Sequence, residues 1–85
     1  MSTDEIVGSV RRVIQAAVGE KGAVSELGDD TDMFESAFLD SVSTVELIAG
    51  LELEFGVKLR DEEVFSPRFT TIRSIAELME ERKRG

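Results

Sequence analysis

The 85-residue chain contains no cysteine, no histidine, no tyrosine and no tryptophan. The absence of cysteine excludes disulfides, a thiolate nucleophile and cysteine-ligated zinc. The absence of histidine removes the side chain most used for proton transfer near neutral pH and the commonest metal ligand. We therefore expect that the chain is not an enzyme and that it has no metal site.

The sequence also has a single proline and no long apolar run. A membrane-spanning helix needs about 18 or more apolar residues, and residues 1–5 lack the basic and apolar parts of a secretory signal. The apolar content of 41% suits one small globular unit. We expect a single domain over residues 1–85, no membrane partner and a cytoplasmic location.

Negative charge is concentrated in the middle of the chain. Residues 20–63 hold 13 acidic against three basic residues, whereas the two ends together hold five acidic and seven basic residues. An acidic middle repels phosphate, which argues against nucleic acid as a partner. It favours encounter with basic surfaces of other proteins, although the same acidity also keeps a small protein soluble.

Apolar residues recur at helical spacing near both ends of the chain. Ser2 and Glu5 fit a capping box before the first stripe, and glycines soon after the stripe end that helix. Thr70 or Thr71 begins the last helix. The two stripes consist of Ile6, Val10, Val13, Ile14 and Ala17, and of Ile72, Ile75, Ala76 and Met79.

Residues 23–39 are predicted to form a long loop. Its acidic cluster resembles a calcium loop, but counting from Asp30 the sixth position is not glycine and the twelfth is Ser41, so turn residues are the better interpretation. Four apolar residues are expected to pin the loop onto the core: Met33, Phe34, Phe38 and Leu39.

A short helix over residues 61–65 is predicted to end before Pro67. Residues 57–59 alternate as in a strand, but no second strand is present for them to pair with. The predicted fold class is therefore all-α, a small helical bundle of three main helices plus one short helix.

The second main helix is predicted to begin at Asp40 or Ser41 and to end at Phe55, where Gly56 suits a left-handed cap. At 100° per residue its apolar residues form two faces. We assign Leu47, Ile48, Leu51 and Phe55 to the core. The second face, flanked by Glu46 and Glu52, consists of Val42, Val45, Ala49 and Leu53.

A helix that is apolar on two sides is either central in its bundle or docks a partner. In the second case the two flanking glutamates pair with Arg or Lys of the partner. Both interpretations hold in part if Val42 lies outside and Leu53 is partly covered.

Ser41 lies at the predicted start of this helix, where a serine is usually only a cap. The free N–H groups and the positive end of the helix dipole also favour an attached phosphate. No histidine or lysine lies near Ser41 in the sequence to activate its hydroxyl. Any modification must therefore be made by another enzyme.

Residues 38–57 resemble the attachment region of acyl and peptidyl carrier proteins. The family pattern is Asp-Ser followed by an aliphatic residue, then Val-Glu-Leu, then an acidic stretch that ends in Phe-Gly. This chain has the same pattern, except that Val42 stands where leucine is commonest. Ser41 matches the attachment serine and Asp40 the acidic residue before it. Glu46 and Glu52 match positions that commonly meet basic residues of partner enzymes.

This resemblance implies a stand-alone carrier that holds acyl or aminoacyl groups as thioesters on a 4'-phosphopantetheine arm attached to Ser41. It implies that a phosphopantetheinyl transferase supplies the arm from coenzyme A, that an adenylating ligase or acyltransferase loads it, and that a downstream synthase or transferase unloads it. The run before Ser41 is most similar to discrete aminoacyl or D-alanyl carriers. A monomer is expected. The alternative is a non-catalytic helical interaction module in which Ser41 is only a cap.

Overall fold

The computed structural model describes residues 2–84 and contains four α-helices and three short 3-10 turns, with no β-strand in that range. The helices are α1 (Thr3–Val18), α2 (Ser41–Phe55), α3 (Asp61–Val64) and α4 (Ile72–Arg84), and the turns are η1 (Gly19–Lys21), η2 (Val24–Glu26) and η3 (Pro67–Phe69). The predicted all-α bundle of three main helices plus one short helix is confirmed. The predicted long loop differs only by the short turn η2.

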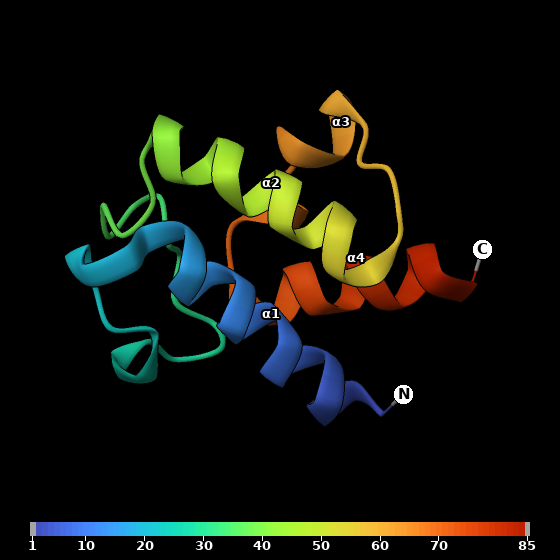
Figure 1. Cartoon of the computed structure of the whole chain (residues 1–85), viewed down its shortest axis with the longest axis horizontal. Helices are drawn as coiled ribbons and strands as arrows, with labels where there is room; N and C mark the ends of the chain where they lie inside the picture. The colour runs from blue at the N-terminus through green and yellow to red at the C-terminus, as the bar shows by residue number, and fades with distance from the viewer. Residues whose placement is uncertain (1, 85) are drawn as a thin grey trace.

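Helix α1 lies against both α2 and α4, and the three long helices enclose one core (Figure 1). The two described ends of the chain lie at one end of the bundle, whereas α2 begins at the opposite end (Figure 1). No helix between residues 2 and 84 is long and apolar enough to cross a membrane.

Ser2 caps α1 as predicted, but the Glu5 carboxylate reaches back to the Ser2 hydroxyl and not to the backbone N–H that a capping box uses. The Ser2 hydroxyl accepts a hydrogen bond from the Glu5 backbone N–H at 3.2 Å and donates to the Glu5 carboxylate at 3.3 Å. The helix ends before Gly19, whose φ of 62° lies in the left-handed region that favours glycine. Within the predicted stripe, Ile6, Val10 and Ile14 are buried, and Val13 and Ala17 pack half-buried against the core.

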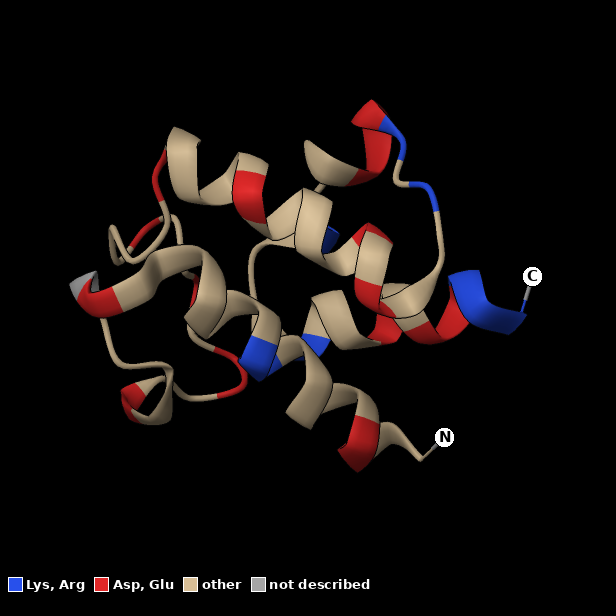
Figure 2. Cartoon of the chain, in the orientation of Figure 1, with Lys and Arg blue, Asp and Glu red and all other residues tan. Residues whose placement is uncertain are grey.

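Helix α4 begins immediately after its cap. The Thr71 hydroxyl accepts from the Ser74 backbone N–H at 3.0 Å, and the Ser74 hydroxyl accepts from the Thr71 N–H at 3.1 Å. The whole predicted stripe is buried, and Leu78 is buried with it. Arg82, Lys83 and Arg84 occupy the last turn, where positive charge stabilises the helix dipole (Figure 2).

The loop before α2 is held by three of the four apolar residues expected to pin it. Met33 and Leu39 are buried and Phe38 is half-buried. The prediction for Phe34 is wrong, because this side chain is 40% exposed. The Asp32 carboxylate accepts hydrogen bonds at 2.9 Å from the N–H groups of Phe34 and the following residue. The resulting turn carries Phe34 at its tip.

Ala37 is the one non-glycine residue between positions 2 and 84 with a positive φ, at 61°. The left-handed conformation costs an L-residue about 1–2 kcal/mol, and glycine avoids this cost. We expect Ala37→Gly to raise the free energy of unfolding by about 1 kcal/mol, as measured by urea denaturation. The matched control is Ala16→Gly, at an exposed position inside α1, which should lower it by about 1 kcal/mol. Equal losses from both substitutions would contradict the strain at Ala37.

An ion pair holds the short helix α3 to α4. The Arg82 guanidinium donates to the Glu63 carboxylate at 2.8 Å, and the Arg60 backbone N–H donates to the same oxygen at 2.9 Å. Burial acts against the charged carboxylate, but these two hydrogen bonds together with the positive charges of Arg82 and Arg60 outweigh it and lower the pKa of Glu63. The stabilisation is therefore complete above the ordinary glutamate pKa of about 4.3 and is lost as the pH falls through the lowered pKa.

Candidate functional site

Asp40, and not Ser41, caps the N-terminus of α2. The Asp40 carboxylate accepts a hydrogen bond from the Ser43 backbone N–H at 2.8 Å, and its carbonyl oxygen accepts from the Thr44 N–H at 2.9 Å. The Thr44 hydroxyl donates to the same carbonyl at 2.6 Å. These contacts decide between the two predicted starts, and they contradict the interpretation of Ser41 as a simple cap.

Ser41 is the first residue of the 15-residue helix α2, and its side chain is exposed. The N–H groups of the first helical turn have no partner within the helix, and the helix dipole adds positive character there. No acidic residue lies in this first turn. An exposed hydroxyl at a positive helix end can carry a phosphodiester, so the residues present fit a phosphopantetheine group.

The chemistry of attachment has to come partly from outside this chain. The sequence has no histidine to deprotonate the serine hydroxyl. Within residues 2–84 no group of three or more His, Cys, Asp or Glu side chains is arranged to hold a metal ion.

The predicted second face of α2 lies in solvent. Val42 is 64%, Val45 67% and Leu53 87% exposed, and Ala49 is exposed with them. The expectation that Leu53 is partly covered is wrong, because its side chain is almost wholly in solvent. We call Val42, Val45, Ala49 and Leu53 the outer strip of α2. Contiguous exposed apolar side chains of this kind indicate a contact surface for a partner.

The opposite face of α2 packs inward largely as predicted. Leu47, Leu51 and Phe55 are buried, while Ile48 is only half-buried. Gly56 ends the helix with a φ of 65°, the left-handed cap that the sequence predicts. The outer strip is therefore additional apolar surface and not the core face of a central helix.

The two glutamates beside the strip differ in their contacts. Glu46 is exposed. Glu52 is half-buried, and its carboxylate accepts a hydrogen bond at 2.8 Å from the Leu59 backbone N–H, so it holds the connection between α2 and α3. That both glutamates form the margin of a partner surface stays a prediction, and Glu52 has this structural contact in addition. All charged residues of α2 are acidic (Figure 2).

Sequence reasoning missed two further features near the strip. A groove of about 440 Å³ lies between α1 and α2, and Leu53 and the exposed Glu54 line it. Gly50 also lines this groove and lets the two helices approach closely, because a Cβ there would lie 2.7 Å from Val13 Cγ1. Phe65, after α3, is 86% exposed. An exposed aromatic residue cannot be recognised from spacing in so short a helix.

Comparison with known proteins agrees with this geometry. A family model described as "Phosphopantetheine attachment site" matches residues 8–79. The acyl carrier protein of Rickettsia bellii (strain RML369-C) is 36% identical over 76 residues, which cover 89% of this chain and 80% of the relative. Acyl carrier protein 2 of Pseudomonas aeruginosa is 32% identical over 78 residues, 92% of this chain and 94% of the relative.

A third relative is named for a different cargo, D-alanine. The D-alanyl carrier protein of Streptococcus pyogenes serotype M5 is 40% identical over 58 residues, which cover 68% of this chain and 72% of the relative. The family match spans most of the chain and includes the exposed serine at the start of α2. The chain therefore belongs to the phosphopantetheine-binding carrier proteins, non-catalytic proteins that carry acyl groups on covalently bound 4'-phosphopantetheine.

Proposed function

We propose that Ser41 is the attachment site of 4'-phosphopantetheine and that residues 1–85 form one carrier domain for acyl or aminoacyl groups. The observation that carries this proposal is the exposed Ser41 hydroxyl at the first position of α2, with the cap supplied by Asp40 instead. Because Asp40 supplies the cap, the serine oxygen is not needed to begin the helix. Its placement is explained by the attachment of a group.

The attachment reaction has a defined balance. The Ser41 Oγ–phosphorus bond forms as the pyrophosphate linkage of coenzyme A breaks, and adenosine 3',5'-bisphosphate leaves. The serine proton passes to a base of the transferase, since this chain has no histidine. The bound group supplies a terminal thiol, which holds the cargo as a thioester and replaces the cysteine that the sequence lacks.

The test measures whether phosphopantetheine becomes covalently attached to the chain. The purified chain is incubated with coenzyme A, magnesium and a broad-specificity phosphopantetheinyl transferase and is then weighed by mass spectrometry. We expect a gain of one phosphopantetheine, located by fragmentation on the peptide that contains Ser41. An unchanged mass would contradict the proposal and favour a helical interaction module, which would use the same outer strip without any modification.

Membership of the family implies contact with a phosphopantetheinyl transferase and with biosynthetic enzymes in general. We propose in addition that an adenylating ligase or acyltransferase loads the arm and that a synthase or transferase unloads it. These partners would dock on the outer strip of α2, with Glu46 at its margin. The exposure of the strip and the acidic character of α2 support an interface that meets basic residues of the partner.

Charge reversal at Glu46 tests this docking surface. We expect Glu46→Lys to lower kcat/KM for phosphopantetheine transfer about tenfold at low salt, mainly through KM, because basic partner residues would then be repelled. The matched control is Glu26→Lys, which changes the net charge equally at an exposed glutamate of η2. Equal kinetics for the two variants would show that Glu46 is only solvated surface.

A further inference from the structure

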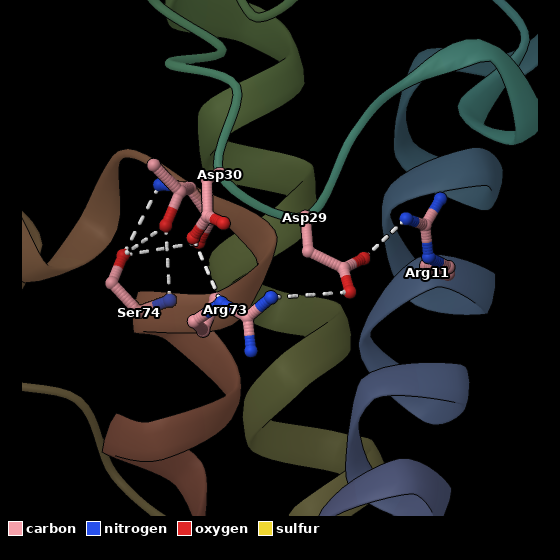
Figure 3. A network of polar contacts seen from close by, with 6 residues as sticks. Arg11, Asp29, Asp30, Arg73 and Ser74 are labelled. Carbon is pink, nitrogen blue, oxygen red and sulfur yellow. Dashed lines mark hydrogen bonds and ion pairs between the residues drawn. The ribbon is translucent and has the colours of Figure 1, made fainter.

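Two arginines hold the middle of the loop between α1 and α2 from opposite sides (Figure 3). Arg11 of α1 donates to the carbonyl oxygens of Val24 at 2.9 Å and Leu27 at 3.0 Å, and also to the Asp29 carboxylate. Arg73 of α4 donates to the neighbouring Asp30 carboxylate at 2.8 Å and places its guanidinium 3.8 Å from the other Asp29 oxygen. Its backbone N–H donates to the Asp29 carbonyl at 2.9 Å. One loop residue is thus tied to two helices.

A second set of contacts holds the loop between Asp29 and Ser41. The Met33 backbone N–H donates to the Thr70 carbonyl at 2.8 Å, and the Met33 side chain is fully buried. The Met33 carbonyl in turn accepts from the N–H groups of Phe38 at 2.9 Å and Leu39 at 3.0 Å. Because Leu39 is buried and directly precedes the cap residue, the loop is held up to the start of α2.

Apart from the hydrogen bonds of the Asp40 cap, the first turn of α2 packs little against the core. Ser43 is its one buried residue, and the first buried apolar side chain of the helix is Leu47. At a rise of about 1.5 Å per residue, Leu47 lies about 9 Å along the axis from Ser41. The position of the Ser41 hydroxyl therefore depends on the loop as well as on the core.

We propose that Arg11, Asp29 and Arg73, here called the Asp29 clamp, position Ser41 for the transfer of phosphopantetheine. The inference rests on the proposed attachment at Ser41. They act as positioning residues, since they reach the serine only through the loop. In the transfer, the serine oxygen has to meet the phosphorus of coenzyme A within the transferase site. A mutation far from the reacting atoms that displaces the serine oxygen by about 1 Å can lower the rate up to about 100-fold.

The experiment compares single-site variants in the transferase reaction, followed by mass spectrometry over time. Asp29→Ala removes the carboxylate that both arginines contact and leaves the outer strip of α2 unchanged. We expect kcat for phosphopantetheine transfer to fall about tenfold, while KM for the carrier changes less than about twofold because docking is preserved. The conservative variant Asp29→Glu is expected to restore most of kcat.

The matched control is Glu81→Ala. It removes an exposed carboxylate of α4 that lies outside the clamp and pairs with Arg68 of η3. It should leave both kcat and KM unchanged. Wild-type kcat in Asp29→Ala, or an equal loss in Glu81→Ala, would overturn the role of the clamp. Failure of the wild-type chain to gain mass would instead overturn the attachment at Ser41.

A second variant keeps the inference testable if Asp29→Ala does not fold, as judged by circular dichroism. Arg73→Ala leaves all three side-chain contacts of Arg11 in place and retains the backbone hydrogen bond to Asp29. We expect this variant to remain folded and to lose about threefold in kcat, with KM unchanged. A folded Arg73→Ala chain with wild-type kcat would overturn the proposal.

Discussion

Ser41→Ala is expected to abolish the gain of mass on incubation with coenzyme A and a phosphopantetheinyl transferase. The substitution removes the hydroxyl that forms the new bond to phosphorus, and an alanine methyl group cannot replace it. The fold should be unaffected, because Ser41 is exposed and Asp40 supplies the cap of α2. The free energy of unfolding should therefore stay within about 0.5 kcal/mol of the wild-type value.

Ser36→Ala provides the control for this result. Ser36 is an exposed serine of the loop that precedes α2, but it lies outside a helix N-terminus. Its substitution should leave the full gain of mass. A gain of mass that survives Ser41→Ala would show that another residue carries the group, and the proposed site would then be wrong even though the chain belongs to the family.

Phe69→Ala is expected to cause the largest loss of stability in this chain. Phe69 ends the turn η3 and is fully buried among the core residues of the bundle. Replacing a buried phenylalanine by alanine costs about 3–5 kcal/mol, because the transfer free energy of the ring is lost and a cavity remains. Small domains have about 5–15 kcal/mol of stability in total, and this one lies near the lower end by size.

Urea denaturation followed by circular dichroism measures this loss. The sharpest control is Phe65→Ala, which makes the same substitution four residues earlier at a side chain that is 86% exposed. Its effect should be within about 0.5 kcal/mol. If the two variants lose similar amounts, the placement of Phe69 in the core is wrong. A destabilised Phe69→Ala chain should also be modified more slowly, since fewer molecules present a formed α2.

The position of the candidate site follows from local signals. Asp-Ser before an amphipathic run, with Gly56 after it, predicted a helix that starts beside Ser41, and α2 begins at that residue. Capping and helical periodicity depend on residues only a few positions apart, so one sequence reveals them. The same reasoning found the Ser2 cap of α1 and the buried stripe of α4.

The other features of the site depend on contacts between different elements of the fold. The Glu52 contact with Leu59 and the Asp29 clamp join different elements, and neither has a periodic pattern. Spacing also failed to separate the buried Met33 from the exposed Phe34.

By itself the sequence determined the helices and the serine beside the start of α2, because a 3.6-residue repeat and turn residues close in sequence specify them. The structure decided that Asp40 and not Ser41 caps α2. Only the tertiary structure decided which apolar residues lie outside, as Leu53 does, and which charged groups hold the loop before Ser41. Burial and ion pairing depend on which elements pack together, and local spacing does not contain that information.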